Sequence, residues 1–500
     1  MEDFDVKNHM KFIVKSGLFL IVLSIVLTLI TQVLLAKSFF DGDWPNTSTT
    51  KNFYKMKKDS IDVLFLGSSH CVSSFSPQEI YDSCGIRSYN LGTEQQSVLV
   101  SYYWLKEALS YQKPMAVVLD VYMCFPYAET PLNSKEGAVR FAIDPMRFSP
   151  VKMEAISAIC EKDQSQNAMS YYNPLIRFHG RWSSLGENDF TYTERLSHDE
   201  MKGYTLLSRY GGNENYQPFE INHSAEPRKM VPLMEEYLDK IVKLCNENKI
   251  ELILVKTPST ASGAAMYNCI FNYAEKYQLS YYDFNEINLN SEINYQFSKD
   301  NADNGHLNYW GAKKVSQKMA EILAGDEHQI PAVFDEQWEN SRDFYEAAAK
   351  SAALPHITDI EAYLEAIRQD QYTIFIAVKD EASASINDSI AEKLRQLGLS
   401  EDLRGKHRNS YYAVISSQGI VERIGEQALS AQGSFRNGRC TYKISSAGYD
   451  VGNNCSIVIN NVEYAKNKRG LNIVVYDTIY RKVVDSVSFD TYSSSLEANR

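Results

Sequence analysis

Residues 61–70 read Ile61-Asp62-Val63-Leu64-Phe65-Leu66-Gly67-Ser68-Ser69-His70. Five of the first six side chains are apolar, and the run stops abruptly at Gly67. A short, continuous apolar run is typical of a strand that is buried on both faces of a parallel sheet. The glycine lets the chain turn sharply at the carboxyl end of this strand, the edge where open α/β sheets bind ligands. A serine there is a candidate nucleophile, although turns and helix N-caps also favour serine.

A second stretch combines an aspartate with a histidine. It reads Asp303-Asn304-Gly305-His306-Leu307-Asn308-Tyr309-Trp310-Gly311-Ala312 and precedes a helix-like segment that extends to about Leu323. An aspartate three residues before a histidine can bond to the same imidazole, fix its tautomer and stabilise its protonated form. The other ring nitrogen can then deprotonate a serine.

Apolar runs alternate with helix-like segments between residues 61 and 325. The expected strands lie at 61–66, 87–91, 115–121, 250–255 and 280–284. The expected helices between them lie at 77–83, 97–110, 231–247 and 261–277. This alternation predicts an α/β domain with a parallel, doubly wound sheet over residues 61–328. Residues 126–230 break the rhythm and are interpreted as an insertion over the site.

The pattern changes after residue 328. Residues 329–355 are interpreted as a linker, and a smaller α+β domain is expected over residues 356–500. Its first half contains helices at 357–367 and 385–397 and strands at 372–378 and 411–416. Its second half contains short β segments at 440–445, 455–464, 470–476 and 482–489.

The N-terminal region contains an apolar run long enough to cross a membrane. Residues 17–36 carry no charge, and twenty helical residues span about 30 Å, one hydrocarbon core. No small-residue cleavage site and no lipobox cysteine follows, so an uncleaved anchor is favoured over a signal peptide. Three lysines precede the run and only one follows closely, which predicts that the N-terminus is inside. These are Lys7, Lys11, Lys15 and then Lys37.

The expected topology follows from this anchor. Residues 1–40 form the cytoplasmic tail and transmembrane helix, and residues 41–60 form a polar tether. No second spanning segment is present in the sequence, so the bulk of the chain is expected outside the cytoplasm, attached to the cell membrane by one helix.

Composition narrows the classes of partner and cofactor. The formal net charge of −12 argues against a nucleic-acid partner, because nucleic acids bind basic surfaces. The eight cysteines show no Cys-x-x-Cys pair or zinc-ligand spacing, so no metal or organic cofactor is expected. Cys440 and Cys455 could pair in an extracytoplasmic domain, but the sequence does not decide this.

Three motifs, in order along the chain, carry a family resemblance. Gly67-Ser68-Ser69, Asn90-Leu91-Gly92 and Asp303-x-x-His306 resemble the SGNH (GDSL-like) hydrolase superfamily. The greatest similarity is to its membrane-anchored members that modify cell-surface polymers, the alginate O-acetyltransferase-like proteins and the D-alanine transfer protein of teichoic acid modification. The resemblance covers roughly residues 58–325 and implies a three-layer α/β/α domain.

The resemblance assigns roles to residues of this chain. Ser69 is the implied nucleophile, with Ser68 as the fallback, His306 is the base, and Asp303 orients it. The backbone N–H groups of Ser69 and Gly92 are two implied oxyanion donors. The family's third donor is an Asn side chain within Gly-x-Asn-Asp. This chain has Leu119-Asp120-Val121-Tyr122 instead, so Asn90 or Tyr122 is the candidate substitute.

Further residues are candidates for lining a substrate site. Two lie next to the motifs, His70 and Asp120. Four lie in the insertion, where cations beside aromatic rings suit sugar stacking and anionic substrates. These are Arg177, His179, Arg181 and Trp182. A folded lid whose arginines pair with local acids is the alternative interpretation.

The C-terminal domain resembles the interleukin-like EMT inducer (ILEI) domain. The resemblance rests on residues 469–476, 487–491 and 374–382. In that family the Arg-Gly-Leu-Asn half comes first, whereas here it comes last, which suggests a circular permutation. The interpretation fails if residues 360–420 and 440–492 form separate units.

The resemblances imply a membrane-anchored, extracytoplasmic serine acyltransferase or esterase. Its expected substrate is a cell-surface polysaccharide or glycopolymer, its acyl group is acetyl, and a membrane-bound O-acyltransferase is the implied partner. The alternative is a non-catalytic envelope protein that binds glycans or organises an assembly on a degenerate SGNH core. The missing Asn block favours this alternative, and the presence of Ser, Asp and His disfavours it.

Overall fold

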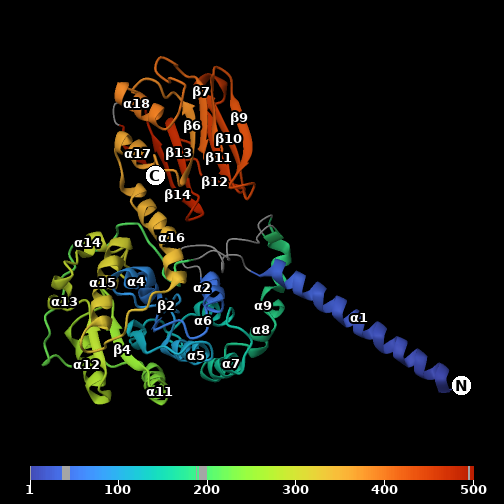
Figure 1. Ribbon diagram of the computed structural model, residues 1–500, viewed down its shortest axis with the longest axis vertical. Coiled ribbons are helices and arrows are strands. Elements are labelled where there is room, and N and C mark those ends of the chain that lie inside the picture. Colours follow the sequence, from blue (N-terminus) through green and yellow to red (C-terminus); the bar gives the residue numbers. More distant parts are fainter. Residues whose placement is uncertain (1, 36–45, 187–188, 191–199, 494–495) are drawn as a thin grey trace. The chain divides into compact units, whose positions relative to one another are not determined.

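The computed structural model describes residues 2–35, 46–186, 189–190, 200–493 and 496–500. The chain forms two compact units (Figure 1). The first contains Met1–Thr205 and Gly212–Asp335, and the second contains Leu206–Gly211 and Glu336–Arg500.

The first unit is built around a parallel sheet of five strands in the order β2-β1-β3-β4-β5. All four pairs of neighbouring strands are parallel. This pairing and this strand order are those of an open, doubly wound sheet. All five strands lie where the apolar runs predicted them, within a few residues. They are β1 (Val63–Leu66), β2 (Ser88–Asn90), β3 (Ala116–Asp120), β4 (Glu251–Lys256) and β5 (Ser280–Asp283).

The helices of the strand–helix repeats pack in two groups. Right-handed crossovers place the helices after β2, β3 and β4 on one face of the sheet and the helix after β1 on the other. In agreement, α5 packs against α11, whereas α15, which follows β5, packs against α4. The helices are α4 (Pro77–Cys84), α5 (Val98–Ala108), α11 (Pro232–Asn248), α12 (Ala264–Tyr277) and α15 (Tyr309–Ala324).

The segment between β3 and α11 contains short helices up to residue 184, and its described residues 200–231 form loops. It contains a 3₁₀ turn η2 (Tyr122–Cys124), α6 (Glu136–Ile143), α7 (Pro150–Lys162), α8 (Ala168–Tyr172), α9 (Leu175–Phe178) and the 3₁₀ helix η3 (His179–Ser184). Three further short helices, α3 (Ser69–Ser74), α13 (Ile287–Glu292) and α14 (Phe297–Asp300), lie near the carboxyl ends of the strands.

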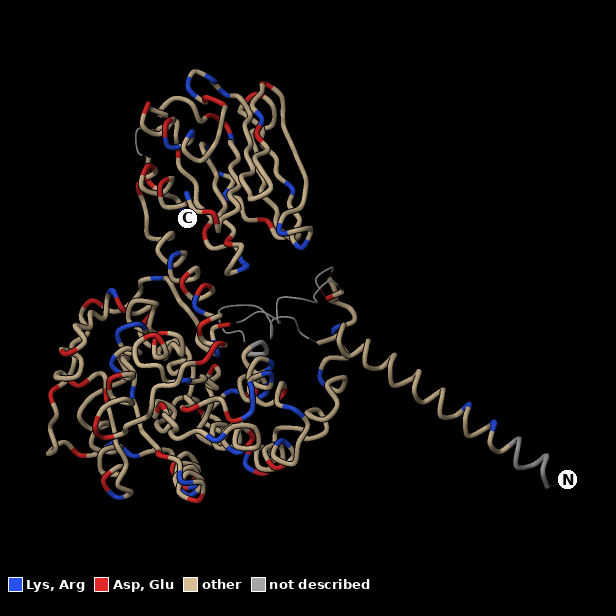
Figure 2. The backbone as a smooth tube through the Cα atoms, viewed as in Figure 1, with Lys and Arg blue, Asp and Glu red and all other residues tan. Residues whose placement is uncertain are grey.

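Helix α1 (Glu2–Leu34) contains the predicted apolar run up to Leu34. Its segment His9–Leu34 is long and apolar enough to span a membrane. Figure 2 shows that the charged residues described on α1 lie toward its N-terminal end, with none toward its C-terminal end. The helix is thus consistent with a single-pass anchor.

The predicted tether over residues 41–60 is corrected in its second part. Helix α2 (Asn46–Phe53) packs on the first unit, because Phe53 is fully buried and its ring lies 5.5 Å from that of Tyr89. The Tyr89 hydroxyl donates to the Thr49 carbonyl at 2.7 Å. An aromatic anchor thus holds the segment on the sheet. Residues 36–45 lie outside the described residues.

The predicted linker over residues 329–355 is also corrected. Helix α16 (Glu336–Ala352) belongs to the second unit. Trp338 is fully buried, and Ser351 Oγ donates to Asp477 Oδ2 at 2.7 Å. An amphipathic helix with that much buried apolar surface is part of a domain core, not a spacer.

The second unit combines helices with a curled sheet of ten strands. Its helical elements are α16, η5 (Leu354–His356), α17 (Ile360–Ala366), α18 (Asp388–Gln396) and η6 (Tyr449–Val451). Its strands are β6 (Tyr372–Asp380), β7 (Ser410–Ser416), β8 (Gly419–Gly425), β9 (Leu429–Phe435), β10 (Cys440–Gly448), β11 (Asn454–Ile459), β12 (Val462–Glu463), β13 (Gly470–Asp477), β14 (Lys482–Phe489) and β15 (Ala498–Asn499).

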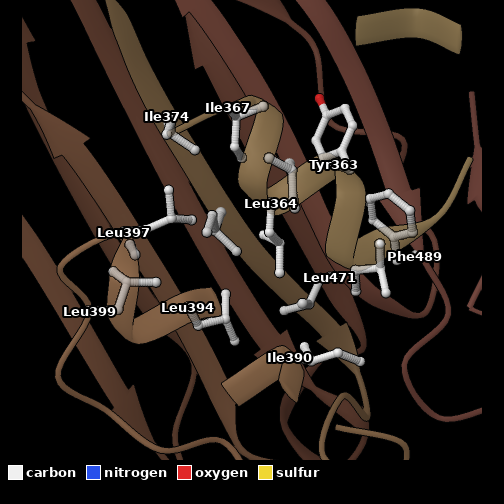
Figure 3. Packing of buried hydrophobic residues seen from close by; sticks show 14 of the residues in the cluster. Tyr363, Leu364, Ile367, Ile374, Ile390, Leu394, Leu397, Leu399, Leu471 and Phe489 are labelled. Carbon is white, nitrogen blue, oxygen red and sulfur yellow. The ribbon is translucent and has the colours of Figure 1, made fainter. Parts of the chain in front are cut away.

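Strand β6 joins the two halves of this unit. It pairs antiparallel with β13 and with β7, and its end pairs parallel with β10. Alternate side chains enter two cores. Ile374, Ile376 and Val378 join a cluster that α17 and α18 cover, and Phe375 and Ala377 join a second cluster with β9–β11. Figure 3 shows part of the first cluster, to which residues of β13 and β14 contribute. Residues 360–420 and 440–492 therefore share one sheet.

The cysteine pairing that the sequence left open is excluded by the strand register. Cys440 lies opposite Phe435, whereas Cys455 lies opposite Ser446. Six residues of strand separate Cys440 from Ser446, about 20 Å, which is far beyond the reach of a disulfide. All eight cysteines are free.

We therefore expect eight reactive thiols in the unfolded chain. Alkylation of protein that was denatured without reductant should modify all eight cysteines, as read by intact mass. A reduced sample is the control and should give the same mass. Two fewer modified cysteines in the unreduced sample would contradict the register.

Candidate active site

Ser69 lies at the carboxyl edge of the parallel sheet, directly after β1. The preceding Gly67 has a φ of +153°, and a Cβ there would lie 2.7 Å from Asp120 Cβ and 2.9 Å from Cys71 Cβ. Only glycine fits this turn, which places Ser69 at the first position of α3.

Ser68 caps this helix. Its Oγ accepts from the His70 N–H at 3.3 Å and donates to Asp120 Oδ2 at 3.4 Å. The sequence allowed either serine to be a helix N-cap, and the structure gives this role to Ser68. The Ser68 hydroxyl bonds to Asp120 and not to the imidazole of His306.

Ser69, His306 and Asp303 form a continuous hydrogen-bonded chain. Ser69 Oγ lies 2.8 Å from His306 Nε2. His306 Nδ1 lies 2.9 Å from Asp303 Oδ1 and 3.0 Å from Oδ2. With a proton on Nδ1 that is donated to Asp303, Nε2 is an acceptor for the Ser69 hydroxyl. The sequence separation between Ser69 and His306 is 237 residues, so the fold brings them together.

The loop that carries Asp303 and His306 is tied at its base. Asn301 and Leu307 form a β-bridge, and the Ala302 N–H donates to the His306 carbonyl at 2.8 Å. Asp303 Oδ1 also accepts from the N–H groups of Gly305 and His306, both at 2.9 Å. The carboxylate is thus oriented by its own loop before it contacts the imidazole.

A pocket of about 260 Å³ opens over these three residues. It is lined by Ser68, Ser69, His70, Glu94, Gln95, Tyr122, Met123, Tyr127, Ser259, Thr260, Ala261 and residues 303–306. Six polar or aromatic lining residues were not predicted from the sequence: Glu94, Gln95, Tyr127, Ser259, Thr260 and Asn304. The first five follow the carboxyl end of β2, β3 or β4, and this position in the strand order was the signal that could have identified them. Asn304 lies between the two predicted residues Asp303 and His306.

Two residues expected at the oxyanion site have other partners. The Gly92 N–H donates to Asn90 Oδ1 at 3.0 Å. Asn90 is fully buried, and its Nδ2 donates to the carbonyls of Cys71 and Phe75. Neither residue lines the pocket, so both are corrected from oxyanion candidates to residues that brace the turn after β2.

Tyr122 lines the pocket, unlike Asn90. Burial, together with Tyr127 and Asp120, raises the pKa of its phenol to about 12. Tyr122 is therefore a neutral hydrogen-bond donor at physiological pH. Asn90 and Tyr122 were the two residues that the sequence offered in place of the family's Asn donor. Of these two, Tyr122 is the one that lines the pocket.

His70 forms a wall of the pocket, as expected. Its ring stacks on that of Tyr122 with 3.6 Å between centroids, and it lies 5.1 Å from the His306 ring. Burial, reinforced by His306 and Lys256, holds the pKa of His70 well below its usual value. The ring is therefore neutral and acts as packing surface beside the Ser69–His306 pair.

Asp120 is corrected from a lining residue to a buried one. It is 2 % exposed and is absent from the pocket wall. Burial raises its pKa to about 6, against the opposing charge of Lys256. Lys256 ends β4 and is fully buried, with its Nζ 5.1 Å from the centroid of the Tyr122 ring. A carboxyl group and an ammonium group therefore lie in the protein interior close to Tyr122 and His70.

The carboxyl group of Asp120 should make stability pH-dependent. Its pKa is 3.8 ordinarily and about 6 in the folded chain, so between these values the folded state binds a proton that the unfolded state lacks. Stability from this group is therefore lost as the pH rises from about 4 to 6, by about 3 kcal/mol. Thermal unfolding of the full chain is measured between pH 4 and pH 7. The loss of stability as the pH rises should be smaller for Asp120→Asn than for the wild type. Asp326→Asn, at an exposed position, is the control. Parallel pH profiles for wild type and Asp120→Asn would contradict the assignment.

The four candidates from the insertion do not line the pocket. Arg177 pairs with Glu136 at 3.0 Å, and His179 Nδ1 lies 3.1 Å from the Leu175 carbonyl. Arg181 pairs with Asp189 at 2.8 Å, and Trp182 is 73 % exposed. Both arginines therefore pair with local acids, as in the alternative interpretation, and the substrate-lining role is corrected. In the described part of the chain, no group of three or more His, Cys, Asp or Glu side chains is placed to hold a metal ion.

Comparison with known families concerns the second unit. Residues 334–420 match the family model Interleukin-like EMT inducer (ILEI). Part of the C-terminal unit is therefore similar to the ILEI family. The match covers α16 to β7 and ends before β13, so the expected circular permutation of the ILEI domain stays a prediction. No curated protein matches the chain.

Proposed function

We propose that the chain is a membrane-anchored, extracytoplasmic serine acyltransferase or esterase with an SGNH-type three-layer domain. The observation that carries the proposal is the hydrogen-bonded chain Ser69–His306–Asp303. It lies at the carboxyl edge of a parallel sheet and opens into a pocket. A nucleophile, a base and an oriented carboxylate in contact are the parts that acyl transfer requires.

The proposed reaction has two half-reactions. His306 Nε2 takes the proton of the Ser69 hydroxyl as Oγ attacks the carbonyl carbon of an acyl donor. The tetrahedral intermediate collapses, the leaving group departs with the proton from His306, and an acyl ester remains on Ser69. A sugar hydroxyl or water then gives its proton to His306 as its oxygen attacks the carbonyl carbon of the ester. The bond between this carbon and Ser69 Oγ breaks, and His306 returns the proton to Oγ. Asp303 stabilises the imidazolium in both half-reactions.

The oxyanion of the intermediate needs hydrogen-bond donors. We assign the Ser69 backbone N–H and the Tyr122 hydroxyl to this role, because the Gly92 N–H is bonded to Asn90. A phenol with a pKa of about 12 stays protonated and can donate to a developing negative charge.

The proposed acceptor is a polysaccharide or glycopolymer of the cell surface. Tyr127 offers an aromatic face, and Glu94, Gln95, Ser259 and Thr260 offer polar groups to sugar hydroxyls in the pocket. Helix α1, with its N-terminus inside, would hold the enzyme beside a membrane-bound O-acyltransferase that supplies acetyl groups.

A non-catalytic envelope protein that binds glycans is the second candidate. It is favoured by Leu119-Asp120-Val121-Tyr122 in place of the Asn block and by the engagement of the Gly92 N–H. The deciding test is whether Ser69 takes up the acetyl group of an activated ester. Oligosaccharides added as acceptors would then distinguish transfer to sugar from hydrolysis.

A further inference from the structure

The end of the insertion contacts the end of the membrane helix. Helix α9 and the 3₁₀ helix η3 both pack against α1, and Figure 1 shows α9 beside the C-terminal end of α1. These elements do not contribute to the pocket. Their position therefore needs an explanation other than substrate binding.

Arg181 fixes this contact through specific hydrogen bonds. Its Nη1 donates to the carbonyls of Leu34 and Leu35, both at 2.7 Å. Its Nη2 donates to Asp189 Oδ1 at 2.8 Å. The last carbonyls of a helix lack partners within the helix, and a cation there also complements the helix dipole. The Arg181 guanidinium thus links η3 to the C-terminal end of α1, where the apolar span ends.

Exposed apolar side chains lie on and beside α8, α9 and η3, and these helices pack in sequence, α8 against α9 and α9 against η3. Five of these side chains, from α8 to the residue after Asp189, have exposed fractions of 40–73 %: Met169, Tyr172, Ile176, Trp182 and Phe190. The ring of Phe148, which is 75 % exposed, packs edge-on against Tyr172 and extends the group. We call these six residues the interfacial surface. Exposed apolar side chains that are carried by neighbouring elements are typical of a site of interaction.

We propose that the interfacial surface rests in the outer head-group layer of the membrane that α1 spans. Its continuity with the end of α1 selects lipid as the occupant, because Trp182 directly follows the residue that bonds the last carbonyls of the span. Trp and Tyr prefer the membrane–water interface, where an apolar ring and a polar edge are both accommodated. The nearby arginines are paired with acids and can remain on the aqueous side. This proposal rests on the membrane anchoring and orientation of α1 in the proposed function, but not on acyl transfer.

The test places Trp182 relative to lipid in the full-length chain. The protein is reconstituted in phosphatidylcholine nanodiscs, with Trp44→Phe as background because residue 44 follows the span closely. In this background, the fluorescence emission of Trp182 is the difference between the protein that retains Trp182 and its Trp182→Phe variant. Brominated phosphatidylcholine should quench most of this emission. Trp310→Phe is the matched control, since α15 packs against α4 and its tryptophan emission should be insensitive to brominated lipid.

Two results would overturn the proposal. If acrylamide, but not brominated lipid, quenches the Trp182 emission, the interfacial surface faces water. If neither quencher acts, the surface is covered by protein, such as a second copy in the same disc. Trp182 is exposed, so its replacement by Phe should leave the fold intact, and circular dichroism checks this.

Discussion

Ser69→Ala should abolish the acetyl adduct that the wild-type chain forms with an activated acetyl ester. The variant removes the hydroxyl that is assigned as the nucleophile and leaves the other residues that line the 260 Å³ pocket in place. Losing one member of a triad lowers turnover by about 10⁴-fold or more. Intact-mass spectrometry of the full-length protein, followed by peptide mapping, would measure the adduct and its position.

His306→Ala should reduce the adduct as severely as Ser69→Ala. Its Nε2 is the base that contacts Ser69 Oγ at 2.8 Å, so the two residues act as one unit. The double variant should then be no worse than either single variant, because members of such a unit are strongly non-additive.

Ser68→Ala is the matched control for this experiment. The substitution removes the same hydroxyl from the neighbouring residue, where it serves as the cap of α3. It should cost about 1 kcal/mol of stability and leave the adduct in place. An adduct that persists in Ser69→Ala but is lost in Ser68→Ala would reverse the assignment. A folded wild-type chain that forms no adduct, even with an acyl-donor partner, would favour the glycan-binding alternative.

The parallel sheet could be predicted because its strands are buried on both faces. Such strands appear in the sequence as continuous apolar runs, and the four residues of β1 are all fully buried. Strands β8 and β9 were missed for the opposite reason. Most of their side chains are exposed or half-buried, so the sequence of each strand carries little hydrophobic pattern.

The contacting Ser, His and Asp could be identified because their motifs are local. Asp303 and His306 share one loop, and Ser69 follows a glycine that the turn requires. The contacts of the residues around this site could not be predicted from the sequence, because they join residues that are far apart in the chain. The sequence does not reveal that Gly92 donates to Asn90, or that Arg181 bonds to carbonyls 146 and 147 residues earlier.

Leu471→Ala should loosen the half of the second unit that lies about 100 residues earlier in the chain. Leu471 is fully buried in β13, where it lies opposite Val378 of β6 and Phe489 of β14. The cavity left by the substitution should cost about 2–5 kcal/mol. Because β6 and β13 share a sheet and a core, amide hydrogen exchange should accelerate in β6 and β7 as well as in β13 and β14.

Ile479→Ala is the control for this variant, since Ile479 lies in the turn after β13 and is 38 % exposed. A surface change of this kind should alter stability by no more than about 0.5 kcal/mol. If Leu471→Ala instead accelerates exchange only within residues 440–492, the two halves unfold separately, and a permuted single domain would be excluded. Strand β6 lies within the residues that match the family model and pairs with both β7 and β13. Coupled exchange across β6 and β13 would therefore mean that residues 440–489 complete the fold that the matched residues begin.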